Sequence, residues 1–191
     1  MATTAPGRTG PYIPASQSLP EITIKGTILG ILLAAILAGA NAYLGLFAGM
    51  TVSASIPAAV ISMGVLRLFK RSNILENNMV QTIASAGEAL AAGVIFTIPA
   101  LIMLHRWTHF DFLQTLMIAG FGGTLGVLFT VPLRRALIVE EGLQFPEGVA
   151  CAQVLETGER GGEGLKYVAG AAIVAALFKF AQTGLRLWSE T

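Results

Sequence analysis

One carboxylate, Glu88, lies within an apolar stretch where its type and spacing could do chemistry. Four polar residues at intervals of four, four and three positions share one helix face: Asn77, Gln81, Ser85 and Glu88. The residues that follow Glu88 up to Leu104 are almost all apolar. A polar stripe that ends halfway along an apolar helix is typical of a cavity open to one side of a membrane.

Two interpretations of Glu88 stay open. A carboxylate inside a membrane is costly unless it is solvated, paired or protonated. Glu88 could therefore bind a proton or contact a substrate, or it could be a structural carboxylate bonded to nearby backbone. Lys179 lies at a similar depth in a later apolar stretch, where it could pair with Glu88 or extend to the outer interface.

His105 and His109 are weak candidates for a metal site. Their i, i+4 spacing lets two imidazoles share a metal if the segment is helical, and Asp111 could be a third ligand. Trp107 and Phe110 lie among them, however, and aromatic residues at a membrane end favour an interfacial turn. We therefore expect neither a metal site nor a cofactor.

The composition indicates an all-α, polytopic membrane protein. The chain is 54% hydrophobic and only 12% charged, whereas a soluble domain carries about 25% charged residues. A net charge of +1 argues against nucleic acid as a partner. The single cysteine, Cys151, excludes an internal disulfide framework. No nucleophile lies in a catalytic motif, so we expect no enzyme.

The uncharged stretch from residue 26 to residue 66 predicts two membrane crossings. One helix of that length would run about 60 Å, roughly twice the hydrocarbon thickness of a bilayer. We place the reversal at residues 41–45. We expect about five spans, at residues 22–41, 45–68, 79–104, 112–133 and 167–187, after a polar, disordered tail at residues 1–20.

Small residues predict how the first two spans pack. In the first span, Gly26 and Gly30 begin a narrow face, continued by Ala34 and Ala38, that another backbone could approach. The second span carries a similar stripe: Gly45, Gly49, Ser53 and Pro57. A proline in mid-span predicts a kink there.

The segment 134–166 is the one long stretch that we do not expect to span. Pro146 could begin a short helix of about ten moderately apolar residues, which is too short to cross and suits a re-entrant or interfacial helix. With the N-terminus in the cytoplasm, the inner segments hold nine basic residues and the outer segments two. This bias predicts a plasma (inner) membrane protein with a cytoplasmic N-terminus.

Several stretches, in collinear order, resemble the oligopeptide transporter (OPT) family, and most closely its prokaryotic and yellow-stripe-like members. They are NAYLGLFAGMTVSASIPAAVISM at residues 41–63, NILENNMVQTIASAGE at 73–88, PLRR at 132–135, FPEG at 145–148, and PYIP and SLP in the tail.

The resemblance implies proton-driven uptake of small peptides or of metal-chelator complexes such as iron-siderophore species. It implies a repeat-built fold of about sixteen spans, of which this chain would be an N-terminal portion. Its partners would be the bilayer, the rest of the transporter and the substrate. Asn77, Asn78, Gln81 and Glu88 would belong to the substrate and coupling region. Phe145, Pro146, Glu147 and Gly148 would belong to a shared loop or re-entrant element.

A non-transporting membrane scaffold, formed by the five spans alone, is the alternative function. It would be favoured if the chain were stable in membranes and bound another protein without moving a solute.

Overall fold

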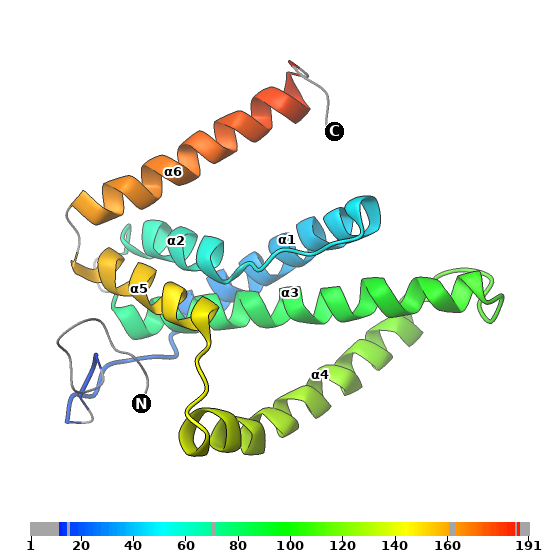
Figure 1. Ribbon diagram of the computed structural model, residues 1–191, viewed down its shortest axis with the longest axis horizontal. Coiled ribbons are helices and arrows are strands. Elements are labelled where there is room, and N and C mark those ends of the chain that lie inside the picture. The colour runs from blue at the N-terminus through cyan, green and yellow to red at the C-terminus, as the bar shows by residue number, and fades with distance from the viewer. Residues whose placement is uncertain (1–11, 15, 70–71, 161–162, 186, 188–191) are drawn as a thin grey trace.

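The computed structural model describes residues 12–14, 16–69, 72–160, 163–185 and 187. Residues 1–11 and 15 of the predicted tail, 161–162 of the predicted loop and 186 of the last predicted span lie outside them. The helices are α1 (Ile24–Ala48), α2 (Ser55–Leu66), α3 (Ile74–Met103), α4 (Phe112–Arg134), α5 (Pro146–Arg160) and α6 (Glu163–Lys179) (Figure 1). The π-helical turns η1 (Arg135–Glu140) and η2 (Phe180–Gly184) extend α4 and α6.

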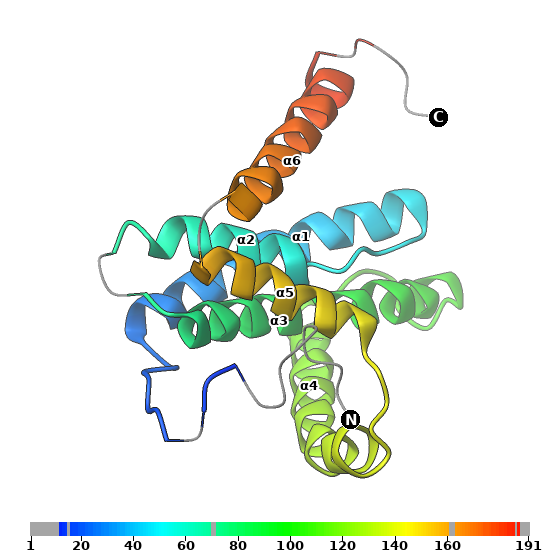
Figure 2. The ribbon, with the colours of Figure 1, turned by 60° about the vertical axis from the view of Figure 1, so that its left-hand side comes forward.

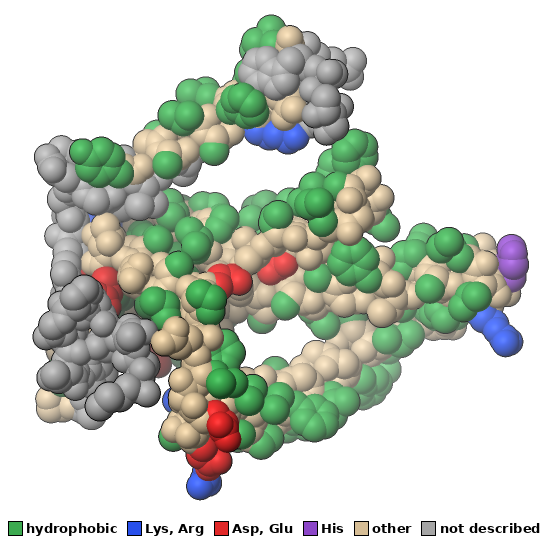
Figure 3. Space-filling view, in the orientation of Figure 1, with side chains coloured by type: hydrophobic (Ala, Val, Ile, Leu, Met, Phe, Trp, Pro, Cys, Tyr) green, Lys and Arg blue, Asp and Glu red, His purple; other side chains and the backbone are tan. Residues whose placement is uncertain are grey.

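Within the described residues, three helices are long and apolar enough to cross a membrane: Ile24–Ala48, Ile74–Met103 and Phe112–Glu140. α4 has no buried residue, and its large apolar side chains, such as Leu113, Phe121 and Leu128, are exposed. Hydrophobic side chains cover the flanks of α3 and α4 (Figure 3). Exposed apolar helices with internally paired backbones are what a bilayer requires, so the prediction of an all-α polytopic membrane protein is confirmed.

Small residues bring α1 and α3 together, and the two helices run parallel. Gly26 lies against Glu76 near the start of both helices, and Gly45 lies against Ile95 near their ends. Between these points the backbones approach closely, since a Cβ at Gly87 would lie 2.7 Å from the Cβ of Ala34. The predicted packing face of the first span is therefore confirmed at Gly26 and Ala34.

The chain reverses later than predicted. α1 continues through residues 41–45, and Gly49 ends it with a left-handed φ of 69° while its N–H donates to the Gly45 carbonyl at 3.0 Å. The extended segment 50–53 then leads through Ala54, whose φ is −93° and ψ 0°, back to α2. The prediction was wrong because the polar group at Asn41 finds partners elsewhere in the fold and does not need a solvated turn.

α2 is too short to be the predicted second span. Its 12 residues measure about 18 Å, roughly half of a bilayer. Pro57 lies in the first turn of α2, where a missing N–H costs no helical bond, so the predicted mid-span kink is wrong. The predicted stripe is also divided, since Gly45 lies on α1, Gly49 caps it and Ser53 lies in the extended segment.

α5 packs against α2 and α3, and these helices form a hydrophobic core with part of the tail. Buried residues of three helices build this core: Ala59, Met63, Ile74, Cys151 and Leu155. Tyr12 and Ile13 of the tail pack against it. In the predicted disordered tail, Tyr12 and Ile13 are therefore held by apolar contacts.

α4 and α6 diverge from the group formed by α1, α2, α3 and α5 in both ribbon views (Figures 1 and 2). α4 begins at the residue predicted, and its helix continues through Pro132 into η1 instead of ending at residue 133. α6 begins four residues earlier than the predicted fifth span.

Candidate functional site

Glu88 lies at the middle of α3, the fifteenth of its 30 residues. Its side chain is 8% exposed, and its Oε1 accepts a hydrogen bond from the Nδ2 of Asn41 on α1, which is itself 3% exposed. A buried charge or acid needs such a partner, because an unpaired one costs several kcal/mol (~3–5). The α1–α3 interface therefore holds one polar pair at the mid-length of α3.

Asn41 also holds the extended segment that follows α1. Its Oδ1 accepts from the backbone N–H of Val52 at 3.0 Å, and its Nδ2 donates to the Val52 carbonyl at 3.1 Å. Non-helical backbone inside a membrane persists only where protein or a cavity satisfies its polar groups. Asn41 supplies both hydrogen bonds to the Val52 backbone. One side chain therefore connects the non-helical segment after α1 to Glu88.

The polar stripe of α3 faces its neighbours, as its spacing predicts. Asn77 is 4% exposed, and its Oδ1 accepts from the Ser62 hydroxyl of α2 at 3.0 Å. Ser85 and Ser55 share a hydroxyl contact of 2.6 Å. These pairs show that α2 runs antiparallel to α3, with its first residue beside Ser85, about 17 Å along α3.

The predicted FPEG element forms the entry to α5. Pro146 begins the helix, as predicted, and Glu147 and Gly148 complete its first turn directly after Phe145. The Glu147 carboxylate accepts a hydrogen bond from the hydroxyl of Ser53. The extended segment after α1 is thus bonded on one side to Asn41 and on the other to α5.

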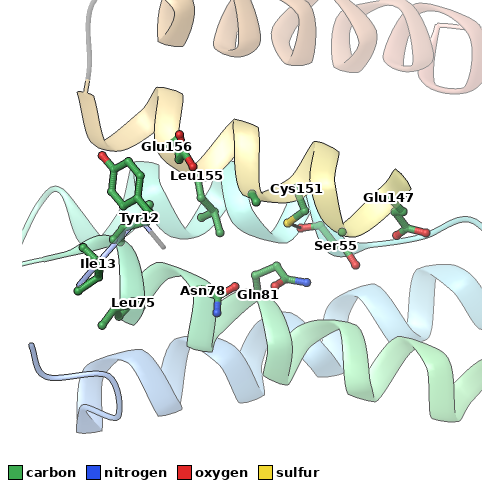
Figure 4. A pocket seen from close by; sticks show the side chains of 13 residues that line it. Tyr12, Ile13, Ser55, Leu75, Asn78, Gln81, Glu147, Cys151, Leu155 and Glu156 are labelled. Carbon is green, nitrogen blue, oxygen red and sulfur yellow. Dashed lines mark hydrogen bonds between the residues drawn. The ribbon is translucent and has the colours of Figure 1, made fainter. Parts of the chain in front are cut away.

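A cavity of about 460 Å³ lies between α3 and α5, and the first residue of α2 and the tail complete its walls (Figure 4). Asn78 and Gln81 of α3 line one wall of the cavity, and Glu147 and Gly148 of α5 belong to the other. The fold therefore brings together two groups of predicted site residues that are more than sixty positions apart in the sequence.

Cys151 also lines this cavity, and burial raises the pKa of its thiol, with a further contribution from the negative charge of Glu147. The thiol is therefore a neutral part of the wall at physiological pH. Its Sγ lies 3.9 Å from the Ser55 carbonyl, to which it can donate.

A family model described as "OPT oligopeptide transporter protein" matches residues 21–190. The chain belongs to the OPT family. A Haemophilus influenzae protein named "Putative oligopeptide transporter" is 52% identical over 149 residues, which are 77% of this chain and 23% of that protein. The OPT chain thus spans under a quarter of the length of this relative. No solved structure matches it.

In this OPT chain, Lys179 does not meet Glu88. Its Nζ lies 3.3 Å from the Oε1 of Gln182 near the end of α6, while Glu88 is held by Asn41. The histidines also differ from the helical arrangement that a shared metal would need. α3 ends at Met103, and His105 has a positive φ of 55° in the turn beyond it. Across the described residues, no three His, Cys, Asp or Glu side chains group as metal ligands.

Sequence reasoning missed several buried polar residues of the OPT chain, and Asn41 and Glu76 are two of them. Asn41 was assigned to a turn, although it is the first amide in a long uncharged run, and that isolation is itself a signal. Glu76 is 1% exposed, with its Oε2 3.2 Å from the Lys25 Nζ and its Oε1 accepting from Thr23. This ion pair joins the starts of α1 and α3.

Proposed function

We propose that this chain forms part of an OPT-family transporter that couples proton movement to the uptake of small peptides or metal-chelator complexes. Glu88 is the proton-binding group in this proposal. The chain supplies the coupling carboxylate and one wall of the substrate path, and the remainder of the transporter completes the path.

One observation carries the proposal. Asn41 bonds both to Glu88, a buried carboxylate at the middle of α3, and to the backbone of Val52, in the non-helical segment between α1 and α2. Transporter sites are commonly built where discontinuous helices meet near the middle of the membrane. An ionisable residue inside a membrane is, by default, a functional candidate because its burial is costly.

Glu88→Gln tests the assignment. The amide oxygen of Gln can still accept from Asn41, so the fold should persist, while the side chain can no longer take up a proton. We expect uptake of a labelled tripeptide into proteoliposomes to lose its dependence on an imposed pH gradient. Glu141→Gln, in an exposed position after η1, is the matched control. Unchanged proton dependence in Glu88→Gln would remove Glu88 from the mechanism.

A further inference from the structure

We infer that the cavity between α3 and α5 binds the amino end of a short peptide, with Glu147 as the partner of its ammonium group. The inference rests on the proposed function, because it names a subsite for the transported solute. It is carried by the size of the cavity, the sign of its charge and the order of polar and apolar groups along it.

The size suits a short peptide. A volume of about 460 Å³ falls within the roughly 300–1,000 Å³ typical of small-molecule sites. The tail closes one end of the cavity with Tyr12 and Ile13, and Glu147 lies at the other end (Figure 4). The space is therefore elongated along α5.

The charge of the lining favours a cation. Among the described residues that line the cavity, the charged side chains are two carboxylates, Glu147 and Glu156. They are nine positions apart on α5, about 14 Å along its axis. Glu147 lies in the first turn of α5, at the end of the cavity opposite the tail. An ammonium group at this end would form a charge-assisted hydrogen bond.

The remaining groups are arranged as a peptide requires. Asn78 and Gln81 lie along the α3 wall, and their amides can donate to and accept from a peptide backbone. Leu155, Leu75 and Ile13 line the end away from Glu147 and offer an apolar surface to side chains. The order along the cavity is thus the Glu147 carboxylate, then the amides, then an apolar surface with Glu156 beside it.

The experiment compares two forms of Ala-Leu-Ala amide, one with a free amino group and one N-acetylated, on the full-length protein in detergent and in proteoliposomes. Amidation leaves the amino group as the one charge of the probe. We expect acetylation to weaken binding about tenfold or more, the scale of a hydrogen bond between charged groups. Glu147→Gln should weaken binding of the free amine by a similar factor, leave the acetylated peptide unchanged and retain the thermal stability of the protein.

Two further measurements keep the inference falsifiable. Glu141→Gln is the matched control and should bind both peptides as the wild type does. Independently of any Glu147 variant, the free-amine peptide should slow maleimide labelling of Cys151, which lines the cavity, and the acetylated peptide should protect it much less.

The possible failures are distinguishable. If both peptides bind equally and protect Cys151 equally, the assignment of Glu147 is overturned, even if proton-driven uptake is intact. Absence of proton-driven uptake for any peptide or chelate, with amine-dependent binding retained, would instead overturn the proposed transport function.

Discussion

At the scale of single residues, Asn41 is the polar centre of the fold, because it bonds to Val52 twice and to Glu88 once. Asn41→Leu would leave these groups without their partner, at a cost of about 1–3 kcal/mol for each buried unsatisfied group. We expect a clear fall in the midpoint of thermal unfolding in detergent.

Gln114→Leu is the control for this prediction, since it removes an amide from an exposed position on α4. It should leave the unfolding midpoint nearly unchanged. Equal midpoints for Asn41→Leu and the wild type would show that the three hydrogen bonds contribute little to stability.

Cys151 provides a test by pH. Burial and the charge of Glu147 raise the pKa of its thiol, and only the thiolate is alkylated at an appreciable rate. We therefore expect the rate of maleimide labelling to rise at a higher pH than for a free cysteine, whose pKa is about 8.5. Glu147→Gln removes the negative charge, which is the smaller of the two causes, and should move the labelling profile partly back toward that of a free cysteine. A profile equal to that of free cysteine would contradict the buried position.

The polar stripe of α3 was predictable from the sequence and its partners were not. Spacing alone placed Asn77, Ser85 and Glu88 on one face, and each contacts α1 or α2. Asn41 is 47 positions from Glu88, and local pattern carries no information on which distant helix supplies a partner. The same limit applies to the pair of Lys25 and Glu76.

At the scale of elements, the parallel pair α1 and α3 depends on the absence of side chains at its contact. A Cβ at Gly87 would lie 2.7 Å from the Cβ and 3.3 Å from the Cα of Ala34, so neither helix can yield locally. We expect Gly87→Val to destabilise the protein by about 1–3 kcal/mol, as overpacking does, measured as the thermal unfolding midpoint.

Gly93→Val is the matched control on the same helix, because no atom lies within 4 Å of a Cβ built there. Both changes replace a glycine of α3 by the same β-branched side chain. The difference between their unfolding midpoints therefore reports the contact with α1. Equal midpoints would mean that α1 and α3 approach less closely than the structure shows.

Two helix starts, those of α4 and α5, were predictable from local signals. Asp111 caps α4 through a bond to the Gln114 N–H, and Pro146 begins α5, both of which are local signals. The end of α1 was misplaced because Asn41, Tyr43 and Gly45 interrupt the aliphatic run, whereas the tertiary contacts that satisfy Asn41 within the helix cannot be read from local pattern. The length of α2 was overestimated because the residues just before it are not helical, and the backbone of Val52 among them is paired by the Asn41 side chain.

At the scale of the whole molecule, the two ends of α3 should lie on opposite sides of the membrane, with its N-terminal end in the cytoplasm. We propose this orientation from the basic residues near that end, including Lys25 and Arg67. In a variant without other cysteines, Ser72→Cys should react with an impermeant maleimide only in inverted vesicles. Thr108→Cys should react in intact cells. Labelling of both from the same side would contradict a crossing by α3.

The shared amide of Asn41 has a thermodynamic consequence. Thermodynamic linkage is reciprocal, so if protonation of Glu88 alters the free energy of the Val52 backbone position, displacement of that backbone alters proton binding by the same factor. Ser53 is the next residue in the chain and bonds to Glu147 at the cavity. A solute that displaces this segment would thus change the affinity of Glu88 for a proton. Protonation of Glu88 would in turn change the affinity for the solute, although the solute and the proton never touch.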